Sequence, residues 1–227
     1  MRINPEISGV SVVLLGNFNP AIFTPAWFAL HDLLPRQATE NAELQVAHPQ
    51  LTRLSMEWLH LHVVTDRFEA STQREPYVRV PDLLVRMFSE HLYHTPLKAF
   101  GINRDVHFRV ADQAERARIG GLLAPAEPWG PWRDELGLSD DYGGMISLTM
   151  AQTRPQDRPV GGQVNVTVEP SSRIDGGRSA IYVRVNDHYA IDRDGIEARE
   201  ELMGLLKDGF EKSIQRSDSI IDYIMSL

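Results

Sequence analysis

Four histidines are the residues whose type and spacing best suit metal or acid–base chemistry. His60 and His62 alternate on an expected strand, so both imidazoles share one face and could reach one metal ion. His107 lies on another expected strand, and His188 directly follows Asp187, a carboxylate that could orient it as a general base. These residues would serve a small-ligand or metal-dependent enzyme or sensor with a histidine-lined pocket between sheet and helices. The alternative is that they are solvated or hydrogen-bonded strand residues, and no G-x-S-x-G nucleophile motif accompanies them.

A second motif is Gly16-Asn17-Phe18-Asn19-Pro20, between an expected strand and an expected helix. It resembles the G-x-F-x-P opening of the nucleotidylyltransferase superfamily, in which a strand delivers a turn that meets nucleotide phosphates. That superfamily continues with H-x-G-H, whose histidines stabilise charge on the transferring phosphate. Here Ala21-Ile22-Phe23-Thr24-Pro25 follows, without a histidine, so the source of that stabilisation is missing. We therefore interpret the segment as a structural turn.

Two tryptophans, Trp129 and Trp132, lie in a segment stiffened by Pro125, Pro128 and Pro131. Aromatic residues dominate the hot spots of protein interfaces, which makes this pair a candidate partner-binding site. The alternative is that both side chains fold back and close one end of the core.

A second candidate contact is the apolar stripe of the C-terminal helix, which we expect to begin at Asp194. Phe210, Ile214 and Ile221 are its candidate partner-binding residues. From position 194 to the end of the sequence there are eight acidic and four basic residues. Such a helix is a natural docking element if the sheet does not cover it fully.

Composition excludes several kinds of chemistry. The 227 residues include no cysteine, which removes disulfides, thiolate metal sites and a cysteine nucleophile. Lys and Arg number 23 against 31 Asp and Glu, so the net charge is −8 and broad nucleic-acid binding is not expected. No apolar run approaches the roughly 20 residues of a membrane-spanning helix, and no secretory signal is recognisable, so we expect a cytoplasmic protein without a cofactor. A local anion site could still form from arginines of two expected loops: Arg154, Arg158, Arg173 and Arg178.

The spacing of apolar residues predicts the elements that must position these side chains. Period-two runs over 146–150, 164–168 and 181–185 predict a three-stranded antiparallel meander. Further strands are expected over 10–15, 43–47, 54–64 and 102–110. After the strand over 54–64, a turn at residues 65–67 is expected to lead into a partner strand that continues through position 70. Helices are expected over 24–34, 80–92, 112–119 and from 194 onward, the last interrupted at Ser217-Asp218.

These patterns predict an α+β fold, with a largely antiparallel β-sheet, helices packed on one face and a C-terminal helix after the meander. We expect residues 1–227 to form a single domain, with a two-lobe division near 124–142 as the alternative.

Two stretches resemble a sporadically distributed family of uncharacterised bacterial proteins: Phe100-Gly101-Ile102-Asn103-Arg104 and Phe210-Glu211-Lys212-Ser213-Ile214. The resemblance implies a bacterial cytosolic protein and transfers neither an activity nor a site.

Together these features favour a non-enzymatic bacterial accessory or interaction protein that acts by binding another macromolecule. We expect it to bind a protein partner or a second copy of itself, as a subunit of a larger assembly. The histidine-based enzyme or sensor is the alternative.

Overall fold

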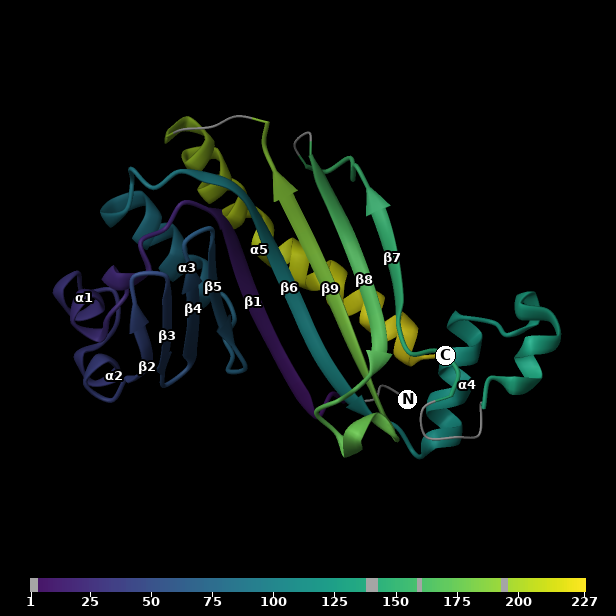
Figure 1. Ribbon diagram of the computed structural model, residues 1–227. Coiled ribbons are helices and arrows are strands. Elements are labelled where there is room, and N and C mark those ends of the chain that lie inside the picture. The colour runs from purple at the N-terminus through teal and green to yellow at the C-terminus, as the bar shows by residue number, and fades with distance from the viewer. Residues whose placement is uncertain (1–3, 138–142, 159–160, 193–195) are drawn as a thin grey trace.

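The computed structural model describes residues 4–137, 143–158, 161–192 and 196–227, and its main feature is one nine-stranded antiparallel sheet (Figure 1). The strand order across the sheet is β2-β3-β4-β5-β1-β6-β9-β8-β7. The strands are β1 (Ile7–Gly16), β2 (Glu43–His48), β3 (Leu51–Met56), β4 (Leu59–Val64), β5 (Arg67–Thr72), β6 (Leu97–Arg109), β7 (Leu148–Thr153), β8 (Gly162–Pro170) and β9 (Ala180–Ala190). The α-helices are α1 (Pro25–Leu30), α2 (Arg36–Glu40), α3 (Arg79–Arg86), α4 (Gln113–Leu123) and α5 (Ile196–Met225). The short helical segments are η1 (Pro20–Ile22), η2 (Met87–His91), η3 (Glu127–Glu135) and η4 (Asp175–Gly177).

The two faces of the sheet differ in polarity because side chains alternate along each strand. On β9, Val183 and Val185 are buried in an apolar cluster that includes Ile221 of α5, while Arg184 between them is exposed. We call the first side the helix face and the other side the open face. The long helix α5 crosses the helix face behind β6, β9 and β8 in Figure 1. The predicted α+β fold is confirmed, including the β7–β8–β9 meander before the C-terminal helix.

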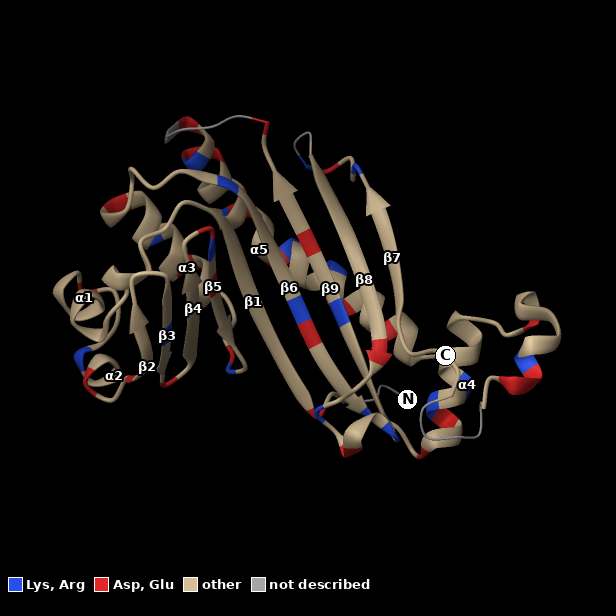
Figure 2. Ribbon diagram, in the orientation of Figure 1, with Lys and Arg blue, Asp and Glu red and all other residues tan. Residues whose placement is uncertain are grey.

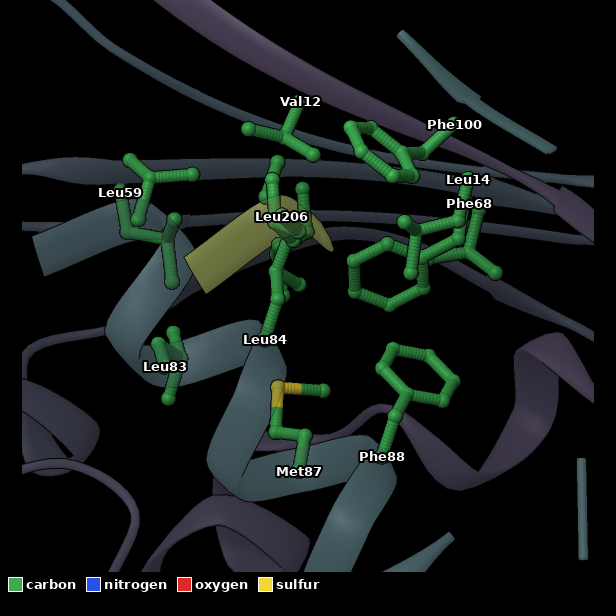
Figure 3. Packing of buried hydrophobic residues seen from close by; sticks show 14 of the residues in the cluster. Val12, Leu14, Leu59, Phe68, Leu83, Leu84, Met87, Phe88, Phe100 and Leu206 are labelled. Carbon is green, nitrogen blue, oxygen red and sulfur yellow. The ribbon is translucent and has the colours of Figure 1, made fainter. Parts of the chain in front are cut away.

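The hydrophobic core on the helix face is divided into two clusters. The larger cluster joins β1, β3, β4 and β5 to α3 and the N-terminal half of α5, and contains every phenylalanine except Phe108. Figure 3 shows part of it, in which the rings of Phe68 and Phe88 pack edge to face, 5.5 Å apart, and Leu206 of α5 belongs to the same cluster. The smaller cluster joins β8, β9 and the end of β6 to α4 and the C-terminal half of α5, where Ile221 packs.

Polar residues separate the two clusters, and we call them the polar seam: Arg104, Ser213, Ser217 and Asp218. On α5, Ser213 and Ser217 are both 1% exposed and lie between the parts of the helix that pack in each cluster. On β6, Arg104 lies between Ile102 of one cluster and Val106 of the other, and its Nε donates to Asp218 at 2.9 Å. The expected interruption at Ser217-Asp218 is therefore a change in what the helix packs against, while α5 itself continues.

Local signals account for several element boundaries. Thr24 caps α1 by accepting a hydrogen bond from the backbone N–H of Trp27, with Pro25 at the first helical position as predicted. The expected strand over 54–64 is instead a hairpin, in which Glu57-Trp58 joins β3 to β4. Helix α4 passes through Gly120-Gly121, where an end was expected. The cap predicted at position 194 lies outside the described residues.

Candidate functional site

Two exposed aromatic side chains lie on η3, which extends beyond α4 and away from the sheet (Figure 1). Trp129 is 59% exposed and Trp132 is 51% exposed, and no residue of η3 is buried. Their rings lie 5.4 Å apart at 64°, an edge-to-face pair. Gly130 between them has φ of 60°, a backbone conformation that suits glycine and that bends the segment. We call Glu127–Glu135 the tryptophan arm.

The tryptophan arm carries mixed but mainly negative charge (Figure 2). Glu127, Asp134 and Glu135 outnumber Arg133, whose Nε lies 3.4 Å from the carboxylate of Asp134. An apolar pair within an acidic surround is complementary to an apolar pocket with a basic rim.

The other predicted partner-binding residues face the chain's own sheet. Phe210 and Ile221 are each 3% exposed, the first in the larger cluster and the second in the smaller. Ile214 is half-buried and packs against the larger cluster. The sheet therefore covers the stripe that would have made α5 a docking element.

The open face carries a row of small polar residues in direct register across neighbouring strands. Ser11 of β1 lies opposite Asn103 of β6, and Asn103 lies opposite Asn186 of β9. Asn186 donates to the side-chain oxygen of Asn103 at 2.7 Å, and Asn103 donates to Ser11 Oγ at 3.1 Å. These hydrogen bonds fix the centre of the open face.

A hollow of about 320 Å³ lies on the open face, and we call it the open-face hollow. His107 and Tyr182 stack on its floor, with ring centroids 4.6 Å apart at 21°. Tyr182 donates its hydroxyl to Asp105, which also accepts from Arg184 Nε at 2.7 Å. His107 Nδ1 lies 2.7 Å from Oγ of Ser171, a serine with no exposed surface. The charged and aromatic groups thus hold each other in place.

The surroundings shift the pKa of three of these groups. Burial lowers the pKa of His107, and the nearby Arg173 lowers it further. Burial and the neighbouring Asp105 carboxylate raise the pKa of Tyr182, so its hydroxyl stays protonated and able to donate. For Arg184, burial opposes the charged form, but Asp105 outweighs it and raises the pKa. The hollow therefore presents a neutral imidazole and a neutral phenol beside paired charges at neutral pH.

The four predicted histidines do not converge. His60 and His107 both line the open-face hollow, but His60 is exposed and its Nδ1 lies 3.1 Å from Ser55 Oγ. His62 lines a neighbouring shallow hollow, and His188 lies on the open face of β9. Within the described ranges, no three His, Asp or Glu side chains are grouped so that they could hold a metal ion. The hollow also lies on the open face, whereas the region between sheet and helices is filled by the core.

Asp187 and His188 point to opposite faces of β9, since they are adjacent on a strand. Asp187 has no exposed surface and is paired with Arg158, which also lies 4.5 Å over the ring of Tyr189. A second arginine, Arg216 of α5, donates to Asp187 at 3.3 Å. The carboxylate therefore anchors the β7–β8 connection and is not directed at the histidine.

The four loop arginines lie in two connections at opposite ends of β8. Arg154 and Arg158 belong to the β7–β8 connection, and Arg173 and Arg178 to the β8–β9 connection at the other end of β8. Arg158 is buried, whereas Arg173 lines the open-face hollow. The open-face hollow therefore receives only Arg173 from this set.

The Gly16 motif forms a turn anchored in the core. A Cβ on Gly16 would lie 2.3 Å from the carbonyl oxygen of Pro96, so only glycine fits. Phe18 is 5% exposed and packs against Phe68. The turn lines a shallow hollow with His91, a residue that the sequence did not indicate as part of a site. The ring of His91 lies against that of His31 at the end of α1, with 4.4 Å between the ring centroids and a tilt of 46°.

Asp105, Tyr182 and Arg184 were not predicted as neighbours of His107. Each residue carries the ordinary polar signal of the outward face of a strand, and only the register of β6 with β9 brings them together.

No protein-family model matches the chain, and no curated protein matches it in sequence. Among the described helices, none is long and apolar enough to cross a membrane.

Proposed function

We propose that this chain is a non-enzymatic accessory protein that binds another protein through the tryptophan arm, as a component of a larger assembly. The observation that carries the proposal is the exposure of Trp129 and Trp132, at 59% and 51%, on a projecting segment without buried residues. Covering each exposed indole would contribute on the order of 2 kcal/mol from apolar area alone. The family resemblance and the absence of cysteine support the bacterial cytoplasm as the setting.

The chemistry of the arm also specifies the partner surface. Edge-to-face indoles with Pro131 between them form a stiff apolar surface, which loses little conformational entropy on binding. The excess of acidic residues around them favours a partner pocket lined by apolar side chains and rimmed by lysine or arginine.

The test is a crosslinking pull-down from the source cells with the wild-type chain and a Trp129→Ala/Trp132→Ala variant. The two indoles form the anchor, so their removal should weaken binding to the captured protein roughly 30-fold or more. Leu30→Ala/Tyr223→Ala is the matched control, because these side chains are 78% and 77% exposed elsewhere. Unchanged capture by the tryptophan variant, or equal loss in both variants, would contradict the proposal.

Intrinsic fluorescence gives an independent readout with the purified partner. Trp58 is 8% exposed, so its fluorescence already comes from an apolar environment. The two tryptophans of the arm are exposed, so their fluorescence comes from an aqueous environment. Binding should shift the emission to shorter wavelength, and Trp129→Phe/Trp132→Phe should remove that shift. An unshifted spectrum on a demonstrated complex would place the contact elsewhere.

The second candidate function is recognition of a small polar ligand in the open-face hollow. The observation that favours it is the contact set of His107, Tyr182, Asp105 and Arg184 in one hollow of about 320 Å³. A thermal-shift screen with phosphates, carboxylates and sugars, together with metal analysis of the purified protein, tests it. A stabilising compound whose effect disappears in Arg184→Ala supports this function, and a metal-free protein that no compound stabilises argues against it.

A further inference from the structure

The outer edge of β7 is the end of the sheet, and within the described part of the chain only β8 pairs with this strand. The backbone N–H of Arg154 donates to the carbonyl of Gly162 at 3.1 Å, so even-numbered residues direct their backbone groups toward β8. Successive residues of an antiparallel strand direct these groups to opposite edges. Thr149, Ala151 and Thr153 therefore present N–H and C=O groups outward. Such a row is a template for another strand.

The strand lacks the features by which sheet edges are usually protected. Leu148–Thr153 contains no charged residue and no proline, and its register with β8 has no bulge (Figure 2). The opposite edge strand, β2, begins with Glu43 and has a bulge between Leu44 and Val46. Charges, prolines and bulges prevent edge-to-edge pairing, so the two edges of this sheet differ in their capacity for it.

Exposed apolar side chains accompany this open edge. Met150 is 65% exposed, although Val166, opposite it on β8, packs against the smaller cluster. Ile146, just before the strand, is 71% exposed. The helix face is therefore covered at β8 but remains apolar and uncovered at β7.

We propose that β7 pairs antiparallel with β7 of a second copy of this chain across a two-fold axis, so that one sheet continues through both copies. In the register that uses all the outward groups, Ala151 lies opposite Ala151 of the partner subunit and Thr149 lies opposite Thr153 of the partner subunit. Residues opposite each other then share a face, and each Met150 comes beside the other copy's strand on the helix face.

The charges at the two ends of β7 favour a second copy as the occupant. Arg154 is exposed and directly follows the C-terminal end of the strand. Glu169 flanks the other end, where it accepts a hydrogen bond from Ser147 Oγ at 3.0 Å. Antiparallel pairing brings the arginine end of one strand beside the glutamate end of the other, twice by symmetry. Opposite charges therefore meet at both ends, and the uncharged middle places no like charges together.

Light scattering after size-exclusion chromatography tests the pairing. The wild-type chain should elute at twice the chain mass of 25.7 kDa. Met150→Lys places charges at the axis, and Ala151→Pro removes an outward N–H that β8 does not use, so both variants should elute at the single-chain mass with unchanged circular dichroism. Leu30→Lys, at a site 78% exposed on α1, is the matched control and should remain dimeric.

Residue-resolved amide exchange provides a second measurement. In the dimer, the backbone amides of Thr149, Ala151 and Thr153 should be protected from exchange. In the Met150→Lys variant these three amides should exchange fast, while the amides at positions 150 and 152 stay protected by their pairing with β8. A wild-type chain that is monomeric at its highest soluble concentration would overturn the proposal. So would a dimer that survives both variants, or a different protein's strand on β7.

The dimer would use β7 and the other partner would use the tryptophan arm, and these share no residue, so the two proposals can fail separately. Trp129→Ala/Trp132→Ala should remain dimeric while it loses its partner, and Met150→Lys should keep the arm's partner while it loses the dimer.

Discussion

At the scale of single residues, the Asp187 carboxylate shows how a charged group can be fixed in the interior. It has no exposed surface, and Arg158 and Arg216 reach it from the β7–β8 connection and from α5. Arg158 is itself only 1% exposed, and burial opposes its charged form, but Asp187 outweighs this and raises its pKa. The charge of Arg158 is therefore retained because the Asp187 carboxylate lies beside it.

Removing the carboxylate should consequently be costly. We expect Asp187→Ala to reduce the free energy of unfolding by about 3–5 kcal/mol, because it leaves the buried Arg158 side chain with only the exposed Asp157, 3.5 Å away, as an ionic partner. Arg216→Ala, at a side chain 30% exposed, should cost about 1 kcal/mol or less and is the comparison variant. Urea unfolding followed by circular dichroism measures both. A loss below about 1 kcal/mol for Asp187→Ala would mean that water replaces the carboxylate.

His107 gives the stability a pH dependence of known sign. Burial and Arg173 lower its pKa in the folded chain below the ordinary value of 6.5, so the unfolded chain binds the proton first as the pH falls. His188 has a pKa lowered by burial and Arg158, and acts in the same direction. The histidine contribution is therefore fully present above pH 6.5 and is lost progressively as the pH falls below that value toward the folded-state pKa.

When the pH falls from 7.5 to 5.5, we expect the free energy of unfolding of His107→Gln to decrease less than that of the wild type. This is about the range over which a histidine titrates. Urea unfolding at both pH values measures the two differences. Equal slopes for wild type and His107→Gln would contradict the assignment.

At the scale of elements, α5 shows how one helix serves two cores. Its apolar stripe is interrupted where Ser213 and Ser217 face the sheet, next to the Arg104–Asp218 pair. Ser217 Oγ donates to the carbonyl oxygen of Ser213 at 2.7 Å. Ser213 Oγ is buried without a hydrogen-bond partner among the described residues. The hydroxyls of the two serines should therefore contribute differently to the free energy of unfolding.

Ser213→Ala should leave stability unchanged or raise it by up to about 1 kcal/mol, because it removes a buried hydroxyl that forms no hydrogen bond. Ser217→Ala should instead lower it by about 1 kcal/mol, since a hydrogen bond is lost. Thermal unfolding of the two variants beside the wild type makes the comparison. A clear loss of stability in Ser213→Ala would indicate that an ordered water satisfies its hydroxyl.

Period-two patterns predicted the elements well where one face is buried and the other polar. β8 and β9 follow this rule, and their valines lie in the smaller cluster. The β3–β4 hairpin was missed because Glu57-Trp58 carries none of the glycine, proline or asparagine that marks a tight turn. The end predicted for α4 at Gly120-Gly121 was wrong, since glycine weakens a helix without ending it when packing supplies the rest.

The candidate sites were predictable only as far as local chemistry reaches. Composition identified Trp129 and Trp132, but whether they were exposed depended on where η3 lies relative to the sheet. Likewise His107 was identified, whereas Tyr182 joins it only through the pairing of β6 with β9, far apart in the sequence. Long-range register is the information that a single sequence did not supply.

At the scale of the whole molecule, one sheet joins two cores of unequal size. The larger cluster contains nearly all the phenylalanines, and the smaller one consists mainly of valines and isoleucines. The polar seam lies between them, and β6, β9 and α5 connect the two clusters because each contributes buried side chains to both. Regions with fewer buried apolar contacts open more readily.

We therefore expect native-state hydrogen exchange to reveal two levels of protection, lower in β8 and in the last turns of α5 than in β1, β4 and β5. Ile221→Ala, which removes a side chain of the smaller cluster, should speed exchange in β8 and α4 and leave β4 and β5 near their wild-type rates. Phe210→Ala, in the larger cluster, should lower protection throughout, because that cluster sets the global free energy of unfolding. Uniform acceleration by Ile221→Ala would mean instead that the sheet couples both clusters into one cooperative unit despite the polar seam.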